Sequence, residues 1–130
     1  MKILLPFHVN KVGAGFPSPA TDYVEEDIDL NSHLIKNIPA TFLIRAQGKS
    51  MNCVGINDGD ILIVDRSLDP KNFSTVVANI NEELIVKTFI KEKNQSFLTS
   101  GSKEIKNKIN LTENPEAIIW GVVTYVIHAL

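Results

Sequence analysis

Two apolar, β-branched runs on either side of a short polar pair constrain the fold of this chain more than any other feature. Residues 73–80 and 83–90 are rich in valine, isoleucine, threonine and phenylalanine, which are typical of strands. The pair between them, Asn81-Glu82, is short enough to close a β-hairpin. Because the second run carries apolar side chains at odd and even positions alike, both faces of that strand are expected to be buried.

Further runs of the same kind predict a small, mainly β domain. We expect strands at residues 41–46 and 60–65, and one long strand or two over residues 117–130. Residues 91–108 are polar and are expected to form a loop with a weak strand. With 130 residues, the chain is long enough for one domain with a real core, but not for two.

A flexible N-terminal arm over residues 1–37 is expected to precede a β domain over residues 38–130. Glycines and prolines keep residues 12–20 extended, because proline lacks an amide donor and biases its neighbour away from helix. Within the arm, residues 29–36 are expected to form a short helix that Asp29 can cap. An extended, unpaired segment is what the cleft of a protease requires of its substrate.

Residues 48–51, with the sequence Gly-Lys-Ser-Met, and Lys87 predict a nucleophile and its base. A serine hydroxyl is a weak nucleophile until a nearby base removes its proton. Lysine can serve as that base only when it is neutral, and apolar surroundings favour the neutral form. Lys87 lies within an apolar run that can supply such surroundings. The ordinary alternative is that Ser50 is a loop serine and that Lys87 extends from a sheet edge into water.

The peptide bond between Ala14 and Gly15 is a candidate cleavage site in the same chain. Ala14 is small enough for a tight pocket, and Gly15 leaves the bond unhindered. A nucleophile, a base and a possible scissile bond in one short chain suggest a protein that cuts itself. The alternative for this segment is an ordinary flexible tail.

Several motifs, taken in order along the chain, resemble those of the LexA/UmuD family of self-cleaving serine peptidases. They are residues 15–20 (GFPSPA), 22–25 (DYVE), 48–51 (GKSM), 58–65 (DGDILIVD) and the pair Val86-Lys87. The family includes the LexA repressor and phage repressors, and the match over residues 16–24 points to its UmuD-like branch. The chain departs from the pattern over residues 98–109, which lack the Pro-Asn motif expected after the lysine strand.

The resemblance implies a role for each of these residues. Ser50 would be the nucleophile, Lys87 the general base and Ala14-Gly15 the scissile bond. The backbone amides of Lys49 and Ser50 would form the oxyanion hole. This Ser-Lys chemistry is similar to that of signal peptidases and is a variant of the serine triad, so we expect no metal and no other cofactor.

The resemblance also implies partners. The fold would be a small β domain like the C-terminal domain of LexA, and the protein would be a homodimer. A RecA filament on single-stranded DNA would activate cleavage during the SOS response to DNA damage. The trimmed product would be the accessory subunit of a UmuC-like, error-prone translesion DNA polymerase. Whether the cut occurs within one chain or between dimer partners stays open.

Composition argues against several other classes of protein. The net charge of −2 provides no strong basic field for direct DNA binding. No apolar run approaches the length of a transmembrane helix, so no membrane partner is expected. The single cysteine, Cys53, fits a cytoplasmic protein and is expected to pack as a small apolar residue. His8, His33 and His128 are scattered and predict no metal site.

Three alternatives stay open from the sequence. The chain could be a protein-binding regulatory module of the same fold that no longer cuts. A Ser-His-Asp triad would supply a base other than Lys87. A LexA-type repressor would need a helix-turn-helix before the cut, and the residues before Ala14-Gly15 are expected to be too few to hold one.

Overall fold

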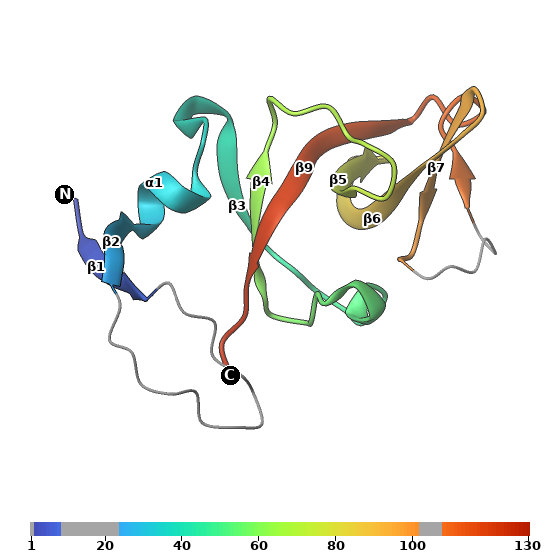
Figure 1. Cartoon of the computed structure of the whole chain (residues 1–130). Helices are drawn as coiled ribbons and strands as arrows, with labels where there is room; N and C mark the ends of the chain where they lie inside the picture. Colours follow the sequence, from blue (N-terminus) through green and yellow to red (C-terminus); the bar gives the residue numbers. More distant parts are fainter. Residues whose placement is uncertain (1, 9–23, 102–107) are drawn as a thin grey trace. The chain divides into compact units, whose positions relative to one another are not determined.

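The computed structural model describes residues 2–8, 24–101 and 108–130 (Figure 1). The chain divides into two compact units, Met1–Lys36 and Asn37–Leu130. Within the described residues, strands predominate and only one short α-helix is present, which confirms the mainly β fold class. No helix in these ranges is long and apolar enough to cross a membrane.

The first unit contains an antiparallel pair of strands that the sequence pattern did not predict. β1 (Leu4–His8) pairs with β2 (Val24–Asp29). Acidic residues, which are poor strand formers, dominate β2. In β1, Pro6 has no backbone N–H and so removes one hydrogen-bond donor from the strand. Because each strand of a lone pair has one open edge, a proline costs little there. The strand pattern was hidden by these residues.

The helix of the first unit follows β2 directly and begins where the sequence predicts. α1 (Leu30–Leu34) has Asp29 as its N-cap. The Asp29 carboxylate accepts hydrogen bonds from the Asn31 amide over 3.3 Å and from the Ser32 hydroxyl over 2.9 Å. These bonds satisfy a donor that the first turn of a helix leaves unpaired. The predicted cap is therefore confirmed.

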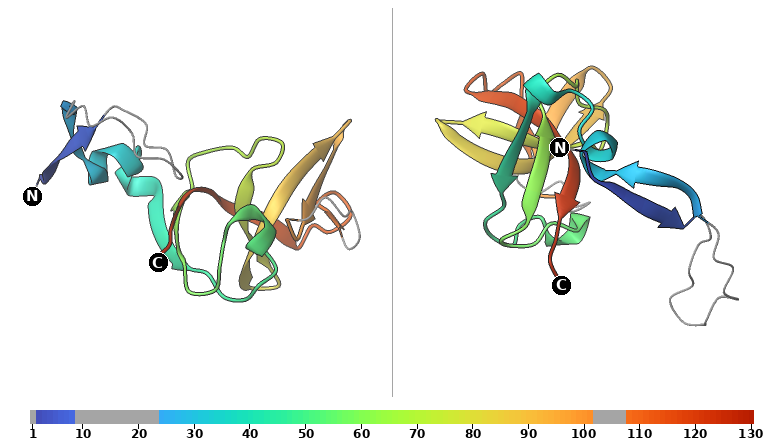
Figure 2. Two further views of the ribbon diagram at one scale, coloured as in Figure 1. Left: turned by 60° about the horizontal axis from the view of Figure 1, so that its bottom comes forward. Right: turned by 90° about the vertical axis from the view of Figure 1, so that its left-hand side faces the viewer.

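In the described residues, the second unit is a seven-stranded antiparallel sheet in the order β3-β4-β9-β5-β6-β7-β8 (Figures 1 and 2). Two 3₁₀-helices, η1 and η2, lie outside the strands. The elements are η1 (Ile38–Ala40), β3 (Thr41–Arg45), η2 (Asn52–Val54), β4 (Ile61–Asp65), β5 (Thr75–Ile80), β6 (Glu83–Glu92), β7 (Gln95–Thr99), β8 (Ile109–Asn110) and β9 (Ala117–Ile127).

The predicted hairpin is present as β5 and β6. Ile80 lies opposite Glu83, so Asn81 and Glu82 alone form the turn. Their φ angles are +51° and +69°, the left-handed pair that a type I′ turn requires. This turn has the twist of the strands it joins, which explains why so short a connection is sufficient.

The polar segment after the hairpin is more regular than predicted. β6 continues to Glu92, and β7 returns beside it with Glu92 opposite Gln95. Phe97 and Leu98 of β7 are buried. The expected weak strand is therefore a full member of the sheet, and its two-residue turn was obscured by the lysines around it.

β9 is one long strand that lies between β4 and β5. At its centre, Gly121 approaches β4 so closely that a Cβ atom built onto it would lie 2.5 Å from Val64 Cγ1. A side chain at position 121 would therefore collide with the core. The sequence left one strand or two open here, and the structure shows one.

Two groups of buried side chains form the core of the second unit. The first contains Ala46, Met51, Ile56, Leu62, Val64 and Val77. The second contains Val76, Ala78, Phe89, Leu98 and Val122. The first group includes residues from the loop that carries Ser50, so packing of the core and placement of that loop depend on each other.

Candidate active site

Ser50 is exposed on the loop between β3 and η2, and residues on both sides of it are held in place. Gly48 has a φ angle of +94°, and its amide donates a hydrogen bond to Asp58 Oδ1 over 2.8 Å. On the other side, the Met51 side chain is only 4% exposed and belongs to the first core group. The fold therefore presents the Ser50 hydroxyl to solvent from an anchored turn.

The backbone amides next to this hydroxyl make no hydrogen bond within the part of the chain that the structure describes. Neither the Lys49 amide nor the Ser50 amide donates a hydrogen bond to another described residue. The Lys49 carbonyl accepts from the Asn52 amide over 3.2 Å, which fixes the turn. Unpaired amides beside a nucleophile are the donors that a developing oxyanion requires.

Backbone hydrogen bonds extend the pairing of β3 and β4 toward the Ser50 loop. The Ala46 amide donates to the Asp60 carbonyl, and the Gly59 amide donates to the Ala46 carbonyl, both over 2.8 Å. Arg45 Nη1 also donates to the Gly59 carbonyl over 2.8 Å. The first part of the loop is therefore tied to the turn before β4.

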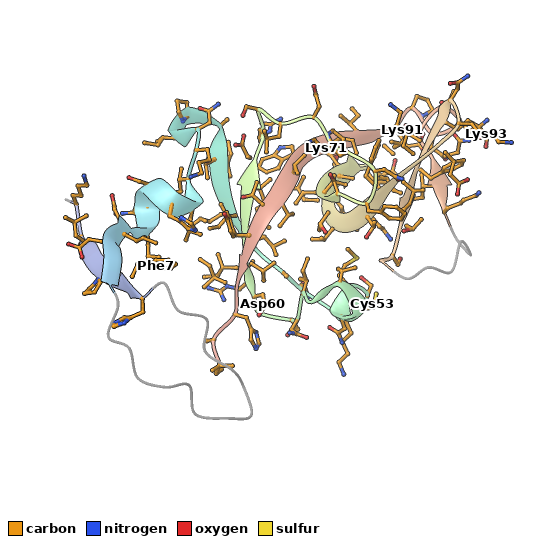
Figure 3. All side chains as sticks on the ribbon, in the orientation of Figure 1. Phe7, Cys53, Asp60, Lys71, Lys91 and Lys93 are labelled. Atoms are coloured by element: carbon orange, nitrogen blue, oxygen red, sulfur yellow. The ribbon has the colours of Figure 1, made fainter. Side chains whose placement is uncertain are left out.

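Asp60 anchors this turn through its side chain as well (Figure 3). Its buried carboxylate accepts a hydrogen bond from the Asn57 amide over 2.8 Å and lies 2.6 Å from His128 Nδ1. The Asn57 amide, followed by the His128 imidazole, lowers the pKa of Asp60 below its ordinary value. His128 therefore has a specific partner, although no hydrogen bond joins it to Ser50.

A cavity of about 400 Å³ opens beside Ser50. Its lining comes from the end of β3, the Ser50 loop, β5 and the first residues of β6, and includes Ile44, Ala46, Met51, Val77, Leu84 and Val86. These side chains are apolar, but the lining also includes the polar residues Arg45, Gln47 and Glu83. Ser50 supplies a hydroxyl to the same cavity. The apolar part of the cavity could therefore receive a small apolar side chain next to Ser50.

The first half of β6 has an open edge beside this cavity. β5 pairs with residues 83–88 of β6, whereas β7 pairs only with residues 88–92. In the part of the chain that the structure describes, no strand pairs with the other edge of residues 83–87. Because residues 83–86 line the cavity, an extended peptide could add here as a further strand.

Lys87 ends this open stretch of β6. It lies opposite Val76 of β5 and is half-buried. Its Nζ atom donates a hydrogen bond to Ser100 Oγ over 3.1 Å. No hydrogen bond joins Lys87 to Ser50, so the predicted dyad stays a prediction.

Gly101 connects the surroundings of Lys87 to the Ser50 loop. Its φ angle is +79°, and a Cβ atom built onto it would lie 3.1 Å from Met51 Sδ and 3.2 Å from Cys53 Sγ. Met51, the residue after Ser50, thus lies beside Gly101, the residue after Ser100. Ser100 in turn accepts the hydrogen bond from Lys87. The segments that carry Ser50 and Lys87 therefore lie close together in the structure.

Two of the other predictions concern Cys53 and the cleavage site. The prediction that Cys53 is packed is wrong, because it is exposed on η2 (Figure 3). Residues 52–55 are all exposed, and the buried positions of this loop are Met51 and Ile56 on either side of them. Ala14 and Gly15 lie outside the described residues.

Ser100 is the site residue that sequence reasoning missed. The antiparallel register of β6 and β7 would have indicated it. Glu92 lies opposite Gln95, and continuing this pairing away from the turn places Ser100 opposite Lys87. That count requires the Lys93-Asn94 turn to be recognised first. A polar, lysine-rich segment gave no reason to expect so tight a turn.

A mainly β domain that presents a serine beside a partly apolar cavity, with a lysine on the strand that lines this cavity, is the arrangement expected of a Ser-Lys peptidase. Residues 6–124 match the model of the family described as Peptidase S24-like. The match spans both described units and includes Ser50 and Lys87.

Individual relatives agree with this match. The chain is 44% identical over 125 residues to the protein ImpA of Salmonella typhimurium, which covers 95% of this chain and 83% of ImpA. It is 36% identical over 121 residues to the protein MucA of Escherichia coli, which covers 93% and 82%. It is 37% identical over 108 residues to the LexA repressor of Hahella chejuensis, which covers 82% and 54%. The chain therefore belongs to the Peptidase S24-like family of self-cleaving serine peptidases, as a UmuD-like member.

Proposed function

We propose that this chain is a serine peptidase that cuts its own Ala14-Gly15 bond, with Ser50 as nucleophile and Lys87 as general base. The observation that carries the proposal is the placement of exposed Ser50 beside a partly apolar cavity and the open edge of β6. Membership of a peptidase family supports the same reaction.

Binding of the cleaved segment follows from the open edge. Residues 12–20 are rich in glycine and proline and suit an extended conformation. Pairing of such a segment with residues 83–87 would supply backbone hydrogen bonds, and the cavity would receive the Ala14 methyl group. A small residue before the cut is therefore part of the proposal.

The first chemical step is acylation of Ser50. Neutral Lys87 takes the proton of the Ser50 hydroxyl, and the oxygen attacks the carbonyl carbon of Ala14. The amides of Lys49 and Ser50 stabilise the resulting oxyanion. Lys87 then gives its proton to the departing Gly15 nitrogen, which leaves Ala14 as an ester on Ser50. For this step the Lys87 amine must reach the Ser50 hydroxyl while the substrate segment is bound.

The second step is hydrolysis of that ester. Lys87, neutral again, takes a proton from a water molecule, which attacks the ester carbonyl. Collapse of the intermediate releases the carboxylate of Ala14 and returns the proton to Ser50. The sequence of steps needs no metal and no cofactor.

The proposal extends to the partners of the product. We infer that the chain acts as a homodimer in the cytoplasm, that a RecA filament on single-stranded DNA promotes the cut, and that the trimmed protein is an accessory subunit of a UmuC-like, error-prone polymerase in the SOS response. Similarity to ImpA and MucA supports the UmuD-like role. In this scheme the activator favours binding of the arm at the open edge.

Mass spectrometry of the purified full chain tests the central proposal. The protein is incubated at mildly alkaline pH, with and without RecA, single-stranded DNA and nucleotide. We expect a product that begins at Gly15 and retains 116 residues, since 130 minus 14 is 116. Ser50→Ala should give no product while its thermal unfolding stays unchanged, because only one exposed oxygen is lost. A product that begins elsewhere would overturn the cleavage-site assignment.

Two alternatives are decided by the same experiment. A chain that stays intact under every condition, although folded, would be the non-cleaving regulatory module. The His128 and Asp60 pair is a specific reason to test a histidine base. If His128→Ala abolished cleavage and Lys87→Ala did not, a histidine mechanism would replace the Ser-Lys mechanism.

A further inference from the structure

We propose that Ser100 is a positioning residue for Lys87, and that its hydroxyl holds the lysine amine in the orientation needed to accept the Ser50 proton. This inference rests on the proposed roles of Ser50 and Lys87. Its basis is the hydrogen bond from Lys87 Nζ to Ser100 Oγ, which is 3.1 Å long. Ser100 itself does not touch the substrate in this scheme.

Ser100 lies between β7 and a residue that borders the Ser50 loop. It follows β7 directly, and both it and Lys87 are half-buried. Gly101 after it packs against Met51 and Cys53 of the loop that follows Ser50. The hydroxyl that binds Lys87 thus lies close to the loop that carries the nucleophile.

The chemistry of a neutral lysine gives this contact a purpose. A neutral amine has two N–H donors and one lone pair, and only the lone pair can take a proton. Donation of one N–H to Ser100 restricts rotation of the amine, so the lone pair can be directed to one side. A long lysine side chain otherwise has many rotamers, and restricting them brings the reacting groups together more often.

Neighbouring hydroxyls provide a contrast. Thr88 and Thr99 lie opposite each other on β6 and β7, and their hydroxyls are buried without a hydrogen-bond partner in the described structure. Ser100 is less buried, yet it is the hydroxyl that Lys87 contacts. Thr99→Val therefore removes an adjacent hydroxyl without touching Lys87, and it serves as a matched control.

The test is the rate of spontaneous cleavage of the full chain in Ser100→Ala, Ser100→Thr and Thr99→Val. We expect Ser100→Ala to cut about tenfold more slowly, the factor that corresponds to loss of one hydrogen bond. Ser100→Thr restores a hydroxyl and should recover most of the rate, and Thr99→Val should cut at the wild-type rate. The midpoint of thermal unfolding should be similar in the two Ser100 variants and the wild type, and somewhat higher in Thr99→Val, which removes a buried hydroxyl that lacks a partner. A Ser100→Ala protein that cuts as fast as the wild type, or faster, would overturn the proposal.

A second measurement does not depend on cleavage. The order of the lysine side chains is measured by NMR relaxation at the Cε methylene groups. In the Ser50→Ala background, Lys87 should be more ordered than exposed Lys71, and Ser100→Ala should reduce its order toward that of Lys71. Unchanged order would reject the positioning role. If order falls as expected while no variant ever cuts, the positioning contact stands and the proposed peptidase activity fails.

Discussion

At the residue scale, Lys87 is the side chain on which the proposed chemistry depends. Arginine at this position keeps donors for Ser100 but stays charged, so it cannot take the proton of Ser50. We expect Lys87→Arg and Lys87→Ala to abolish self-cleavage, with a rate at least about 100-fold below wild type. The rate is measured by gel densitometry over several days at alkaline pH.

Two controls accompany this prediction. Lys71→Ala removes an exposed lysine outside the sheet and should leave the rate unchanged. His128→Ala should retain most of the cleavage, because His128 contacts Asp60 and has no hydrogen bond to Ser50. Cleavage by Lys87→Ala at the wild-type rate would remove the Ser-Lys mechanism.

Asp60 gives a prediction for stability against pH. The pKa of Asp60 is lowered in the folded protein, mainly by the Asn57 amide and then by His128. A lowered pKa means that the folded state favours the carboxylate, so the stabilisation is present at neutral pH. It is lost as the pH falls through the acid range, below about 4. Asp60→Asn should therefore lower the unfolding midpoint at pH 7 and have a smaller effect near pH 3.

Thermal melts of both proteins across this pH range provide the measurement. Asp69→Asn, which changes an exposed loop aspartate, is the matched control and should show no such trend. If the unfolding midpoint of Asp60→Asn lay below that of the wild type by the same amount at every pH, loss of the carboxylate charge would not be the cause of the destabilisation.

At the element scale, the β5–β6 turn contains a residue that is poorly suited to its backbone. Glu82 has a φ angle of +69°, which favours glycine. Glu82→Gly should therefore raise the free energy of unfolding by roughly 0.5–1 kcal/mol. Glu83→Gly, one residue later at the start of β6, should lower it by a similar amount because glycine weakens a strand. Chemical denaturation measures the free energy of unfolding of both variants. If the two substitutions changed it in the same direction, the turn assignment would be contradicted.

The centre of β9 provides the opposite case. A Cβ atom at position 121 would lie 2.5 Å from Val64 Cγ1, so Gly121→Ala forces the strands apart. We expect a loss of about 1–3 kcal/mol in the free energy of unfolding. Ile118→Ala changes an exposed position of the same strand and should cost less than about 1 kcal/mol. Urea unfolding followed by fluorescence measures the free energy of unfolding of both variants. If Gly121→Ala left this free energy unchanged, β9 would be able to shift away from β4.

Elements with a strong apolar pattern could be predicted from the sequence, and elements with a weak one could not. The β5–β6 hairpin follows from its β-branched runs, and α1 follows from the Asp29 cap. β7 was underestimated because its buried residues, Phe97 and Leu98, stand among polar ones. Ser100 could not be found for the same reason, since its relation to Lys87 exists only once β6 and β7 are in register. Sequence motifs located Ser50, but the contacts that anchor its loop are long-range.

At the scale of the whole molecule, apolar side chains remain exposed on the long C-terminal strand. Ile118 is 62% exposed and Ile127 is 45% exposed. Exposed apolar surface on a strand favours association, in agreement with the proposed homodimer. We expect light scattering to show a dimer at micromolar concentration, and Ile127→Asp to shift it toward monomer.

Leu68→Asp is the control for this prediction, because it places the same charge at a similarly exposed position between β4 and β5. It should leave the dimer intact. A wild-type protein that is monomeric under these conditions would count against the homodimer.

The open edge of β6 has a kinetic consequence when the substrate is part of the same chain. A segment tethered to the domain experiences an effective concentration in the millimolar range, so even weak strand pairing can hold it at residues 83–87. If the Ala14-Gly15 bond is cut as proposed, the fragment is no longer tethered and its concentration at the edge falls to that in bulk solution. The reaction would therefore be irreversible in practice and limited to a single turnover, and a free peptide of the same sequence should be a poor inhibitor.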